Sequence, residues 1–371
     1  MELTDAGPII VFAVLALALF VPLAFGWPRW GGRIGRVVVR ALQLVVLNVV
    51  VIALCFTVLN DQYYFYSSWN DLFGARASQV QLHHGGSTRQ VQSAKLSGPG
   101  VTRVGGSRDY ALPQPGARLQ TYTVTYPATT ATAKVLVYLP AGYDPTSSRN
   151  YPVIVGLHGF PGGPLSYSHA NNFFSTADQL TAAHQLAPSI FVVPAINVPA
   201  DVDTECINGP PGSPQAETWL AKDLPAWVVR HLHVRTDRTS WVAMGFSYGA
   251  WCAAFLTMEH PETFAGAIVF LGYFRPEFAT DYAPYSPAQL RKYDLVKLAE
   301  TSPPPVAMWV FSSRQDASSY PTTSRFLSHV KAPLDVSATI VATGGHRASV
   351  YEPFTTSALT WLSKTFPHFR A

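Results

Sequence analysis

The chain has 371 residues, of which 13% are charged, and its formal net charge is +4. This composition excludes a disordered chain, and the length suits one large or two ordinary domains. The 26 basic and 22 acidic residues nearly balance, and no basic stripe is interleaved with aromatic residues, so we expect no nucleic-acid partner. The mean hydropathy of +0.13 is high for a soluble protein and predicts that part of the chain lies in lipid.

Two uncharged runs near the N-terminus, residues 9–25 and 41–59, are each long enough to span a bilayer. We therefore expect two transmembrane helices, at about 9–25 and 38–59, which form a membrane anchor over residues 1–60. The alternative is that one of the two runs is a buried core helix.

The orientation of this anchor follows from its arginines. They are Arg29, Arg33, Arg36 and Arg40. All four lie in the predicted connection 26–40, which the positive-inside rule places in the cytoplasm. A secretory signal peptide would begin with basic residues, whereas this chain begins with Glu2 and Asp5. We expect both helices to be retained, with the rest of the chain outside the cell or in the periplasm.

Residues 61–116 are predicted to be a connector. The aromatic residues at its start suit a membrane interface, and they are Tyr63, Tyr64, Phe65, Tyr66 and Trp69. The later part is rich in glycine and has the character of a loop. His83 and His84 could bind a metal, but two adjacent histidines without further ligands favour simple solvent exposure.

From Arg118 onward, short β-rich runs alternate with segments of helix length, which predicts an α/β fold. Eight runs have strand character: RLQTYTVTY, AKVLVYLP, YPVIVGLHG, SIFVVPA, SWVAMG, AGAIVFLG, VAMWVFSS and SATIVATG. The first two are close together and alternate polar with apolar residues, so we expect an antiparallel hairpin that leads into a parallel sheet. The segments predicted as helices are 172–186, 215–231, 248–259, 287–299, 319–330 and 351–364.

The segment Gly245-Phe246-Ser247-Tyr248-Gly249 matches G-x-S-x-G, the sharp strand-to-helix turn that lifts a serine above a sheet. An apolar run of strand character precedes it, and an apolar run of helix length follows it. Glycines flank the serine because bulky side chains there would clash with the adjacent strand and helix. The pattern predicts that Ser247 is a nucleophile; the alternative is a structural turn.

Two further predicted strands end in loops with acid and base candidates, Asp316 after VAMWVFSS and His346 after SATIVATG. A serine hydroxyl is a poor nucleophile at neutral pH, so an imidazole must accept its proton while a carboxylate orients the imidazole. The chain order Ser247, Asp316, His346 is the order of an α/β-hydrolase triad. Asp281 and Glu277, after the preceding strand, are alternative candidates for the acid.

The loop 157–163, Leu-His-Gly-Phe-Pro-Gly-Gly, has the position and the glycine content of an oxyanion loop. We expect the backbone N–H groups of Phe160 and Tyr248 to be the oxyanion donors. His158 could act as a base, but a His-Gly pair at a strand end favours a structural role.

The chain has three cysteines. Cys55 lies in the second apolar run and is expected to pack or to face lipid. Cys206 and Cys252 would both lie outside, where an oxidising compartment allows a disulfide bond. Two free buried thiols are the open alternative.

At these residues the chain resembles the esterase D-like α/β-hydrolases, the group that includes mycobacterial mycolyltransferases and S-formylglutathione hydrolases. The resemblance covers roughly residues 118–366 and extends to the segment 217–227, whose Glu217 is expected to be structural. It implies an α/β-hydrolase fold over residues 117–371 and ester chemistry through an acyl-serine, without a metal or an organic cofactor. The acid is Asp here, as in the esterases, whereas the mycolyltransferases use Glu and have no two-helix anchor.

These features together predict a membrane-anchored, outward-facing serine esterase. Its substrate is expected to be an ester of a lipid or another envelope component, such as an acyl or aminoacyl lipid. One alternative is an acyltransferase of the mycolyltransferase type, since the same triad serves both reactions. Another is a non-catalytic envelope scaffold on a hydrolase fold.

Overall fold

A computed structural model describes residues 3, 6–25, 33–63, 65–74, 79–84, 117–125, 132–169, 171–200 and 202–371. The chain divides into two compact units. The smaller one comprises Met1–Ser78, Ser313–Ser318 and Val341–Arg347, and the larger one comprises Gln79–Ser312, Ser319–Ile340 and Ala348–Ala371. The smaller unit therefore joins the N-terminal helices to two short segments from the predicted catalytic domain.

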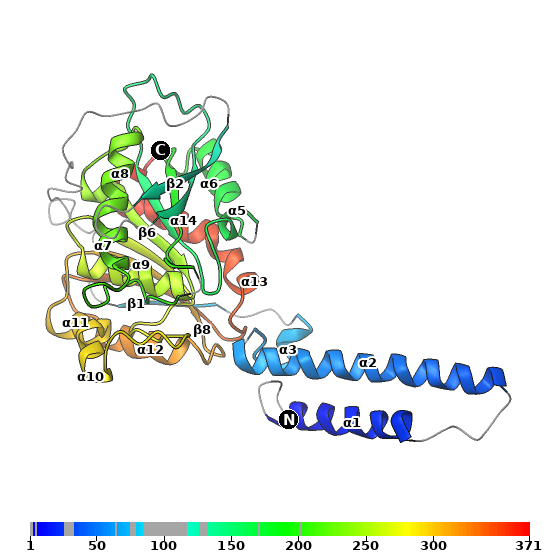
Figure 1. Ribbon diagram of the computed structural model, residues 1–371. Helices are drawn as coiled ribbons and strands as arrows, with labels where there is room; N and C mark the ends of the chain where they lie inside the picture. Colours follow the sequence, from blue (N-terminus) through cyan, green and yellow to red (C-terminus); the bar gives the residue numbers. More distant parts are fainter. Residues whose placement is uncertain are drawn as a thin grey trace. The chain divides into compact units, whose positions relative to one another are not determined.

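The smaller unit contains the helices α1 (Ala6–Phe25), α2 (Arg33–Tyr63) and α3 (Trp69–Leu72) (Figure 1). Helices α1 and α2 pack against each other, and both are long and apolar enough to cross a membrane. They leave large apolar side chains uncovered, such as Leu17 at 63% and Ile52 at 67% exposure. Lipid tails can cover such side chains.

Helix α2 begins at Arg33 and not at residue 38. The prediction that all four arginines lie in a connecting loop is therefore wrong for Arg33, Arg36 and Arg40, which belong to the first turns of α2. Arginine is a good helix former, so a helix can continue past the end of its apolar run. Arg29 lies outside the described residues, as do residues 85–116 of the predicted connector and the side chains of His83 and His84.

The larger unit is built on a nine-stranded sheet in the order β1-β9-β8-β7-β6-β4-β5-β3-β2. Its strands are β1 (Gln79–His84), β2 (Leu119–Thr125), β3 (Thr132–Tyr138), β4 (Val153–Leu157), β5 (Ile190–Pro194), β6 (Trp241–Phe246), β7 (Gly266–Phe270), β8 (Ala307–Ser313) and β9 (Asp335–Val341). All eight predicted strands are confirmed, and β1 adds a ninth at the edge, from the predicted connector.

The pairing of the strands also agrees with the prediction. Strands β2 and β3 form an antiparallel hairpin, and β3 pairs antiparallel with β5. Strand β4 runs parallel to β5 and β6, and β7 runs parallel to β6 and β8. The central strands are buried along their whole length, which explains why they read as continuous apolar runs in the sequence.

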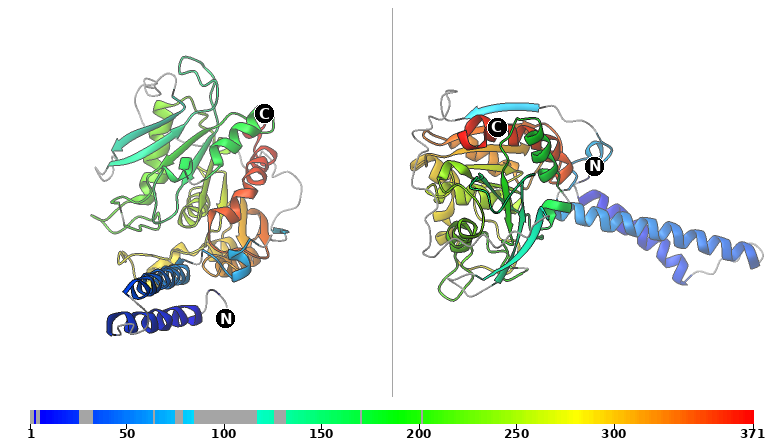
Figure 2. Two further views of the ribbon diagram at one scale, coloured as in Figure 1. Left: turned by 90° about the vertical axis from the view of Figure 1, so that its right-hand side faces the viewer. Right: turned by 90° about the horizontal axis from the view of Figure 1, so that it is seen from above.

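Helices cover both faces of the sheet (Figures 1 and 2). They are α5 (Ser166–His169), α6 (Phe173–Ala182), α7 (Ala216–Thr218), α8 (Leu224–His231), α9 (Tyr248–Glu259), α10 (Pro287–Leu290), α11 (Leu295–Thr301), α12 (Tyr320–His329), α13 (Ala348–Tyr351) and α14 (Thr355–Thr365). Helix α9 packs on β6 and β7, and α6 packs on α14. The aromatic rings of Phe173, Phe270 and Tyr351 join α6, β7 and α13.

Three predicted helices are interrupted. Residues 215–231 contain a π-helical turn, Trp219–Asp223, between α7 and α8. Residues 287–299 break at Asp294, whose extended backbone and side-chain bonds to the N–H groups of Val296 and Lys297 begin α11 anew. Residues 351–364 contain the 3₁₀ turn Glu352–Phe354 before α14.

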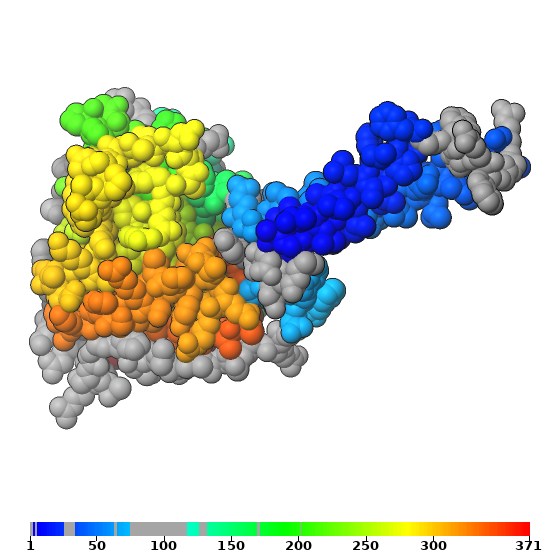
Figure 3. All heavy atoms as spheres, turned by 90° about the horizontal axis from the view of Figure 1, so that it is seen from below, coloured from blue at the N-terminus to red at the C-terminus, as the bar shows by residue number. Residues whose placement is uncertain are grey.

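The segment after β7 lies on the surface of the larger unit. Figure 3 shows residues 272–290, in yellow, beside helix α12, in orange, on one face. The ring of Phe274, in this segment, stacks on the ring of Phe326, in α12, with centroids 3.9 Å apart. Both side chains are fully buried, so this segment belongs to the packed domain.

Candidate active site

Ser247 occupies the single position between β6 and α9. Its backbone has φ 55° and ψ −127°, a conformation that a residue with a side chain rarely adopts. Three backbone hydrogen bonds hold it there. Its N–H donates to the carbonyl of Phe270 at 2.9 Å, and its own carbonyl accepts from the N–H groups of Ala250 at 2.9 Å and Trp251 at 3.2 Å. The predicted sharp strand-to-helix turn is present.

The flanking glycines are required by close contacts. A Cβ atom on Gly245 would lie 2.1 Å from the carbonyl oxygen of Gly249, and a Cβ atom on Gly249 would lie 2.1 Å from the carbonyl oxygen of Leu157 in β4. Both distances are far below van der Waals contact. The first glycine thus lets the chain pass α9, and the second lets α9 approach β4, as the sequence pattern predicts.

The loop after β4 reaches the start of α9. The ring of Phe160 makes an edge contact with the ring of Tyr248, with centroids 6.0 Å apart. Tyr248 is the first residue of α9, where the helix itself leaves backbone N–H groups without partners. The two residues predicted as oxyanion donors are therefore neighbours.

His158 is a structural residue of this loop. Its side chain is buried, and its Nδ1 lies 2.8 Å from the carbonyl oxygen of Gly159, while its Nε2 lies 3.2 Å from the backbone N of Ile196. These partners require a neutral ring with the proton on Nδ1. Burial lowers the pKa of His158 to about 4, although the bond to Gly159 opposes the shift. Both ring nitrogens are engaged, which leaves none for a substrate.

A cavity of about 340 Å³ opens beside the same loop. Phe160 and its neighbours up to Pro164 form one wall, and the start of β3, Ala195 and residues 197–200 form the others. Asn197, 8% exposed, lies in this wall, and its Oδ1 is buried without a protein partner. The cavity combines apolar surface with a polar group that a bound molecule can satisfy.

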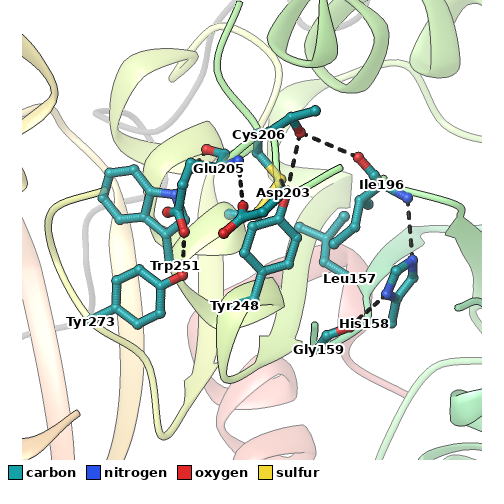
Figure 4. Close-up of a disulfide and its surroundings, with 12 residues drawn as sticks. Leu157, His158, Gly159, Ile196, Asp203, Glu205, Cys206, Tyr248, Trp251 and Tyr273 are labelled. Atoms are coloured by element: carbon teal, nitrogen blue, oxygen red, sulfur yellow. Dashed lines mark hydrogen bonds between the residues drawn. A yellow bond between two sulfur atoms is a disulfide. The ribbon is translucent and has the colours of Figure 1, made fainter. Parts of the chain in front are cut away.

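Cys206 and Cys252 form a disulfide bond, so the predicted bridge is confirmed (Figure 4). It fastens the loop around residue 205 to helix α9. The indole of Trp251 donates to the carbonyl of Glu205 at 2.9 Å, and the hydroxyl of Tyr273 donates to the carboxyl of Glu205 at 2.7 Å. The Glu205 side chain is fully buried, and burial, together with the nearby Asp203, raises its pKa well above the ordinary value.

In the smaller unit, the loops after β8 and β9 bring Asp316 and His346 together. The Nδ1 of His346 lies 2.8 Å from Oδ2 of Asp316, whose side chain is completely buried. The hydroxyl of Ser318 donates to the other carboxylate oxygen, Oδ1, at 2.6 Å. Because the carboxylate can only accept, Nδ1 carries the proton and Nε2 is the basic nitrogen.

The alternative acids lack such surroundings. Asp281 is exposed, and Glu277 is exposed and pairs with Arg275 at 3.0 Å. Glu217, expected to be structural, lies 2.9 Å from Nε2 of His260, the residue that follows α9. Of these carboxylates, only Asp316 has a recorded bond to the imidazole of His346.

The predicted residues thus form two groups. The larger unit brings Ser247, Tyr248 and Phe160 together, and the smaller unit holds Asp316 with His346. Among the residues that the structure describes, no cluster of three or more His, Cys, Asp or Glu side chains is arranged for a metal ion.

Three site residues were missed in the sequence. Ser318 could have been found, because a serine two residues after an aspartate often bonds to its side chain. Asp71 and Arg347 pair at 2.6 Å but are 276 positions apart, and no local pattern connects them.

Comparison with known proteins gives a family. A family model described as "Putative esterase" matches residues 127–362. An uncharacterised protein of Corynebacterium glutamicum is 29% identical over 148 residues, which are 38% of this chain and 33% of that protein. The match therefore spans about a third of the length of this relative.

Several solved structures are similar. A ferulic acid esterase has a TM-score of 0.56 at 17% identity, over 67% of this chain and 98% of its own. An S-formylglutathione hydrolase of Agrobacterium tumefaciens has a TM-score of 0.55 at 17% identity, over 69% and 99%. A fluorophosphonate-binding serine hydrolase of Staphylococcus aureus has a TM-score of 0.53 at 15% identity, over 67% and 99%. These likenesses establish the α/β-hydrolase fold.

Proposed function

The chain belongs to the esterase family, and from this membership we propose that it is a membrane-anchored serine esterase that acts through Ser247, Asp316 and His346. The observation that carries the proposal is the hydrogen bond between His346 and the fully buried Asp316. It leaves Nε2 of His346 as a base, which is what a serine nucleophile requires.

The strand directions support the grouping of the three residues. Strands β6, β7 and β8 are parallel, so their carboxyl ends lie at one edge of the sheet. Ser247 follows β6 and Asp316 follows β8, and in sheets of this type the reacting groups stand beyond that edge. His346 comes with Asp316 through their hydrogen bond.

The first half of the proposed reaction forms an acyl-serine. The Oγ of Ser247 attacks the ester carbonyl while Nε2 of His346 takes its proton. The N–H groups of Phe160 and Tyr248 stabilise the negative oxygen of the tetrahedral intermediate. His346 then gives the proton to the leaving alkoxide, the C–O bond breaks, and the alcohol departs.

The second half returns the enzyme to its starting state. Water attacks the acyl carbonyl and gives a proton to His346, and the same N–H groups bind the new oxyanion. When the intermediate collapses, Ser247 leaves and regains its proton from His346. The acid is released, and Asp316 stays ionised throughout because it stabilises the imidazolium and does not take its proton.

We place the substrate among the esters of lipids or other envelope components, acyl or aminoacyl. The apolar helices α1 and α2 support this, because they would hold the enzyme beside a membrane. Only part of the substrate need enter the protein, and the cavity of about 340 Å³ beside Phe160 is of a size for that part. We place the catalytic domain outside the cytoplasm.

The proposal is tested with the full chain in detergent, with a fluorophosphonate probe and a soluble p-nitrophenyl ester. Ser247→Ala is expected to abolish both labelling and hydrolysis. Ser175→Ala, which removes an exposed hydroxyl that donates to the carbonyl of Asn172 at 3.0 Å, is the matched control and should keep both. Undiminished labelling of the Ser247→Ala protein contradicts the proposal and favours a scaffold without catalysis.

The physiological substrate is sought in the membrane. Envelope lipids of cells with the active protein are compared with those of cells with the Ser247→Ala protein. One esterified lipid should accumulate in the variant. Product analysis with and without an added acceptor alcohol then separates hydrolysis from acyl transfer, since a transferase gives a new ester only when the acceptor is present.

A further inference from the structure

The loop that carries His346 is held from both sides by one carboxylate, that of Asp71 in α3. Arg347 donates two hydrogen bonds to it, at 2.7 and 2.6 Å, and the backbone N–H of Gly345 donates a third at 3.0 Å. Gly345 and Arg347 are the two neighbours of His346 in the chain. Asp71 therefore binds the backbone of the residue before His346 and the side chain of the residue after it.

Further contacts of Arg347 connect it to the end of helix α2. Arg347 donates to the carbonyl of Phe65 at 2.7 Å, and its guanidinium lies over the ring of Tyr66, 4.3 Å from the centroid. The backbone of Tyr66 is bonded twice to the side chain of Asn60, at 2.7 and 2.9 Å. Asn60 is 1% exposed and belongs to the last turn of α2. A continuous set of bonds thus runs from the end of an apolar helix to the residue beside His346.

Gln315, the residue before Asp316, is bonded to the segment that carries Asp71. The hydroxyl of Ser67 donates to Oε1 of Gln315 at 2.7 Å, and Gln315 directly precedes Asp316. Ser67 also donates its backbone N–H to Asp71 at 2.9 Å. The segment 65–74 therefore contacts chain neighbours of both Asp316 and His346.

The ion pair between Asp71 and Arg347 is not a solvated surface contact. The side chain of Asp71 is 5% exposed and that of Arg347 is 20% exposed. Burial alone would raise the pKa of Asp71, but the hydrogen bonds from Arg347, Ser67 and Gly345 and the charge of Arg347 outweigh it and hold the pKa below its ordinary value. Asp71 is therefore ionised at neutral pH, and replacing Arg347 leaves this buried carboxylate with its bonds from Ser67 and Gly345 but without the neighbouring positive charge.

We propose that Asp71 and Arg347 are positioning residues for His346, and that the segment 65–74 couples the end of helix α2 to the catalytic histidine. This inference rests on the proposed role of His346 as the base. A displacement of a catalytic group by about 1 Å can cost about 10²-fold in rate. Loss of the ion pair between Asp71 and Arg347 should therefore affect turnover and not only folding.

The test compares Asp71→Ala, Arg347→Ala and the double variant with the wild-type full chain in detergent, using a soluble p-nitrophenyl ester. We expect kcat to fall about 10- to 100-fold in each single variant, with KM changed less than about twofold, because Asp71 and Arg347 are proposed to act through the position of His346 and not through binding of the ester. The double variant should lose no more than the worse single variant, since the two residues act as one unit.

Asp178→Ala is the matched control. It removes another bidentate Arg–Asp pair, with Arg118 at 2.6 and 2.9 Å, in the larger unit. Its kcat should remain that of the wild type. Arg347→Lys keeps the charge but loses the two-bond geometry, so it carries the test if the alanine variants do not fold. Asp71→Glu, which keeps the charge and both oxygens, should recover part of the lost kcat.

The outcomes separate this inference from the proposed function. If folded Asp71→Ala and Arg347→Lys both have wild-type kcat while Ser247→Ala is inactive, the positioning role is wrong and the serine mechanism stands. An equal fall in kcat for Asp178→Ala also overturns it, because the effect is then general. If the Ser247→Ala protein remains active, the proposed function itself fails.

Discussion

The Nδ1 atom of His346 lies 2.8 Å from Oδ2 of Asp316, a carboxylate with no exposed surface. A buried anion in this place holds the imidazole in the tautomer that leaves Nε2 basic, and it stabilises the imidazolium after proton transfer. Ser318 occupies the other carboxylate oxygen at 2.6 Å, so the carboxylate cannot turn away without losing that bond.

Asp316→Asn should therefore lower kcat by about 10²- to 10⁴-fold with little change in KM, because an amide at this position favours the wrong imidazole tautomer. The measurement is hydrolysis of a soluble ester by the purified full chain. Asp281→Asn, at an exposed position, is the control and should be near normal. Near-normal turnover of Asp316→Asn contradicts the assignment of the acid.

Gly249→Ala should destabilise the larger unit by about 3 kcal/mol or more, since the new Cβ atom would lie 2.1 Å from the carbonyl oxygen of Leu157 and must push α9 away from β4. Gly163→Ala is the matched control, because a Cβ atom there meets nothing within 4 Å. Denaturant unfolding measures both. Equal stabilities of the two variants would show that α9 can shift without cost.

The bond between Cys206 and Cys252 closes a span of 46 residues, for which the chain-entropy model gives about 4 kcal/mol of stability. Cys206→Ala with Cys252→Ala should lower the unfolding free energy by up to about that amount. The unfolded wild-type protein should show one free thiol, that of Cys55, and three after reduction. A thiol count that reduction does not change contradicts the bridge.

The lowered pKa of His158 predicts that the free energy of unfolding falls in weak acid. Its pKa is lowered from 6.5 to about 4 in the folded protein, so between these values the unfolded chain binds a proton that the folded chain does not. Stability therefore falls as the pH drops from 6.5 towards 4, by roughly 3 kcal/mol at most. His158→Gln removes the titrating group and should flatten this part of the curve of unfolding free energy against pH. An unchanged slope means that His158 is not the group responsible.

The orientation of the anchor can be measured with two reporters fused after Ala371. A reporter that is active only outside the cytoplasm should be active, and one that is active only in the cytoplasm should not, because α1 and α2 are expected to cross the membrane twice with their connection inside. The reverse result would place the catalytic domain in the cytoplasm and remove envelope esters from the candidate substrates.

Much of the fold could be predicted because the periodicity of these segments is strong. The buried parallel strands β4 to β8 are continuous apolar runs, and the Gly-x-Ser-x-Gly turn has a steric cause that the contacts of Gly245 and Gly249 bear out. The break within residues 287–299 was missed, because Asp294 begins a new helix through local hydrogen bonds that overrule the apolar pattern. Strand β1 was missed because it lies in a segment that otherwise has loop composition.

The sequence by itself determined the order of strands and helices, the turn that holds Ser247, and the candidates for the acid and the base, because each of these depends on residues close together in the chain. Only the tertiary structure decided which carboxylate meets His346 and that Cys206 bonds to Cys252. It alone revealed that Asp71 holds both neighbours of His346. These pairings join residues far apart in the sequence, and their partners are selected by the packing of the whole chain, which no local pattern records.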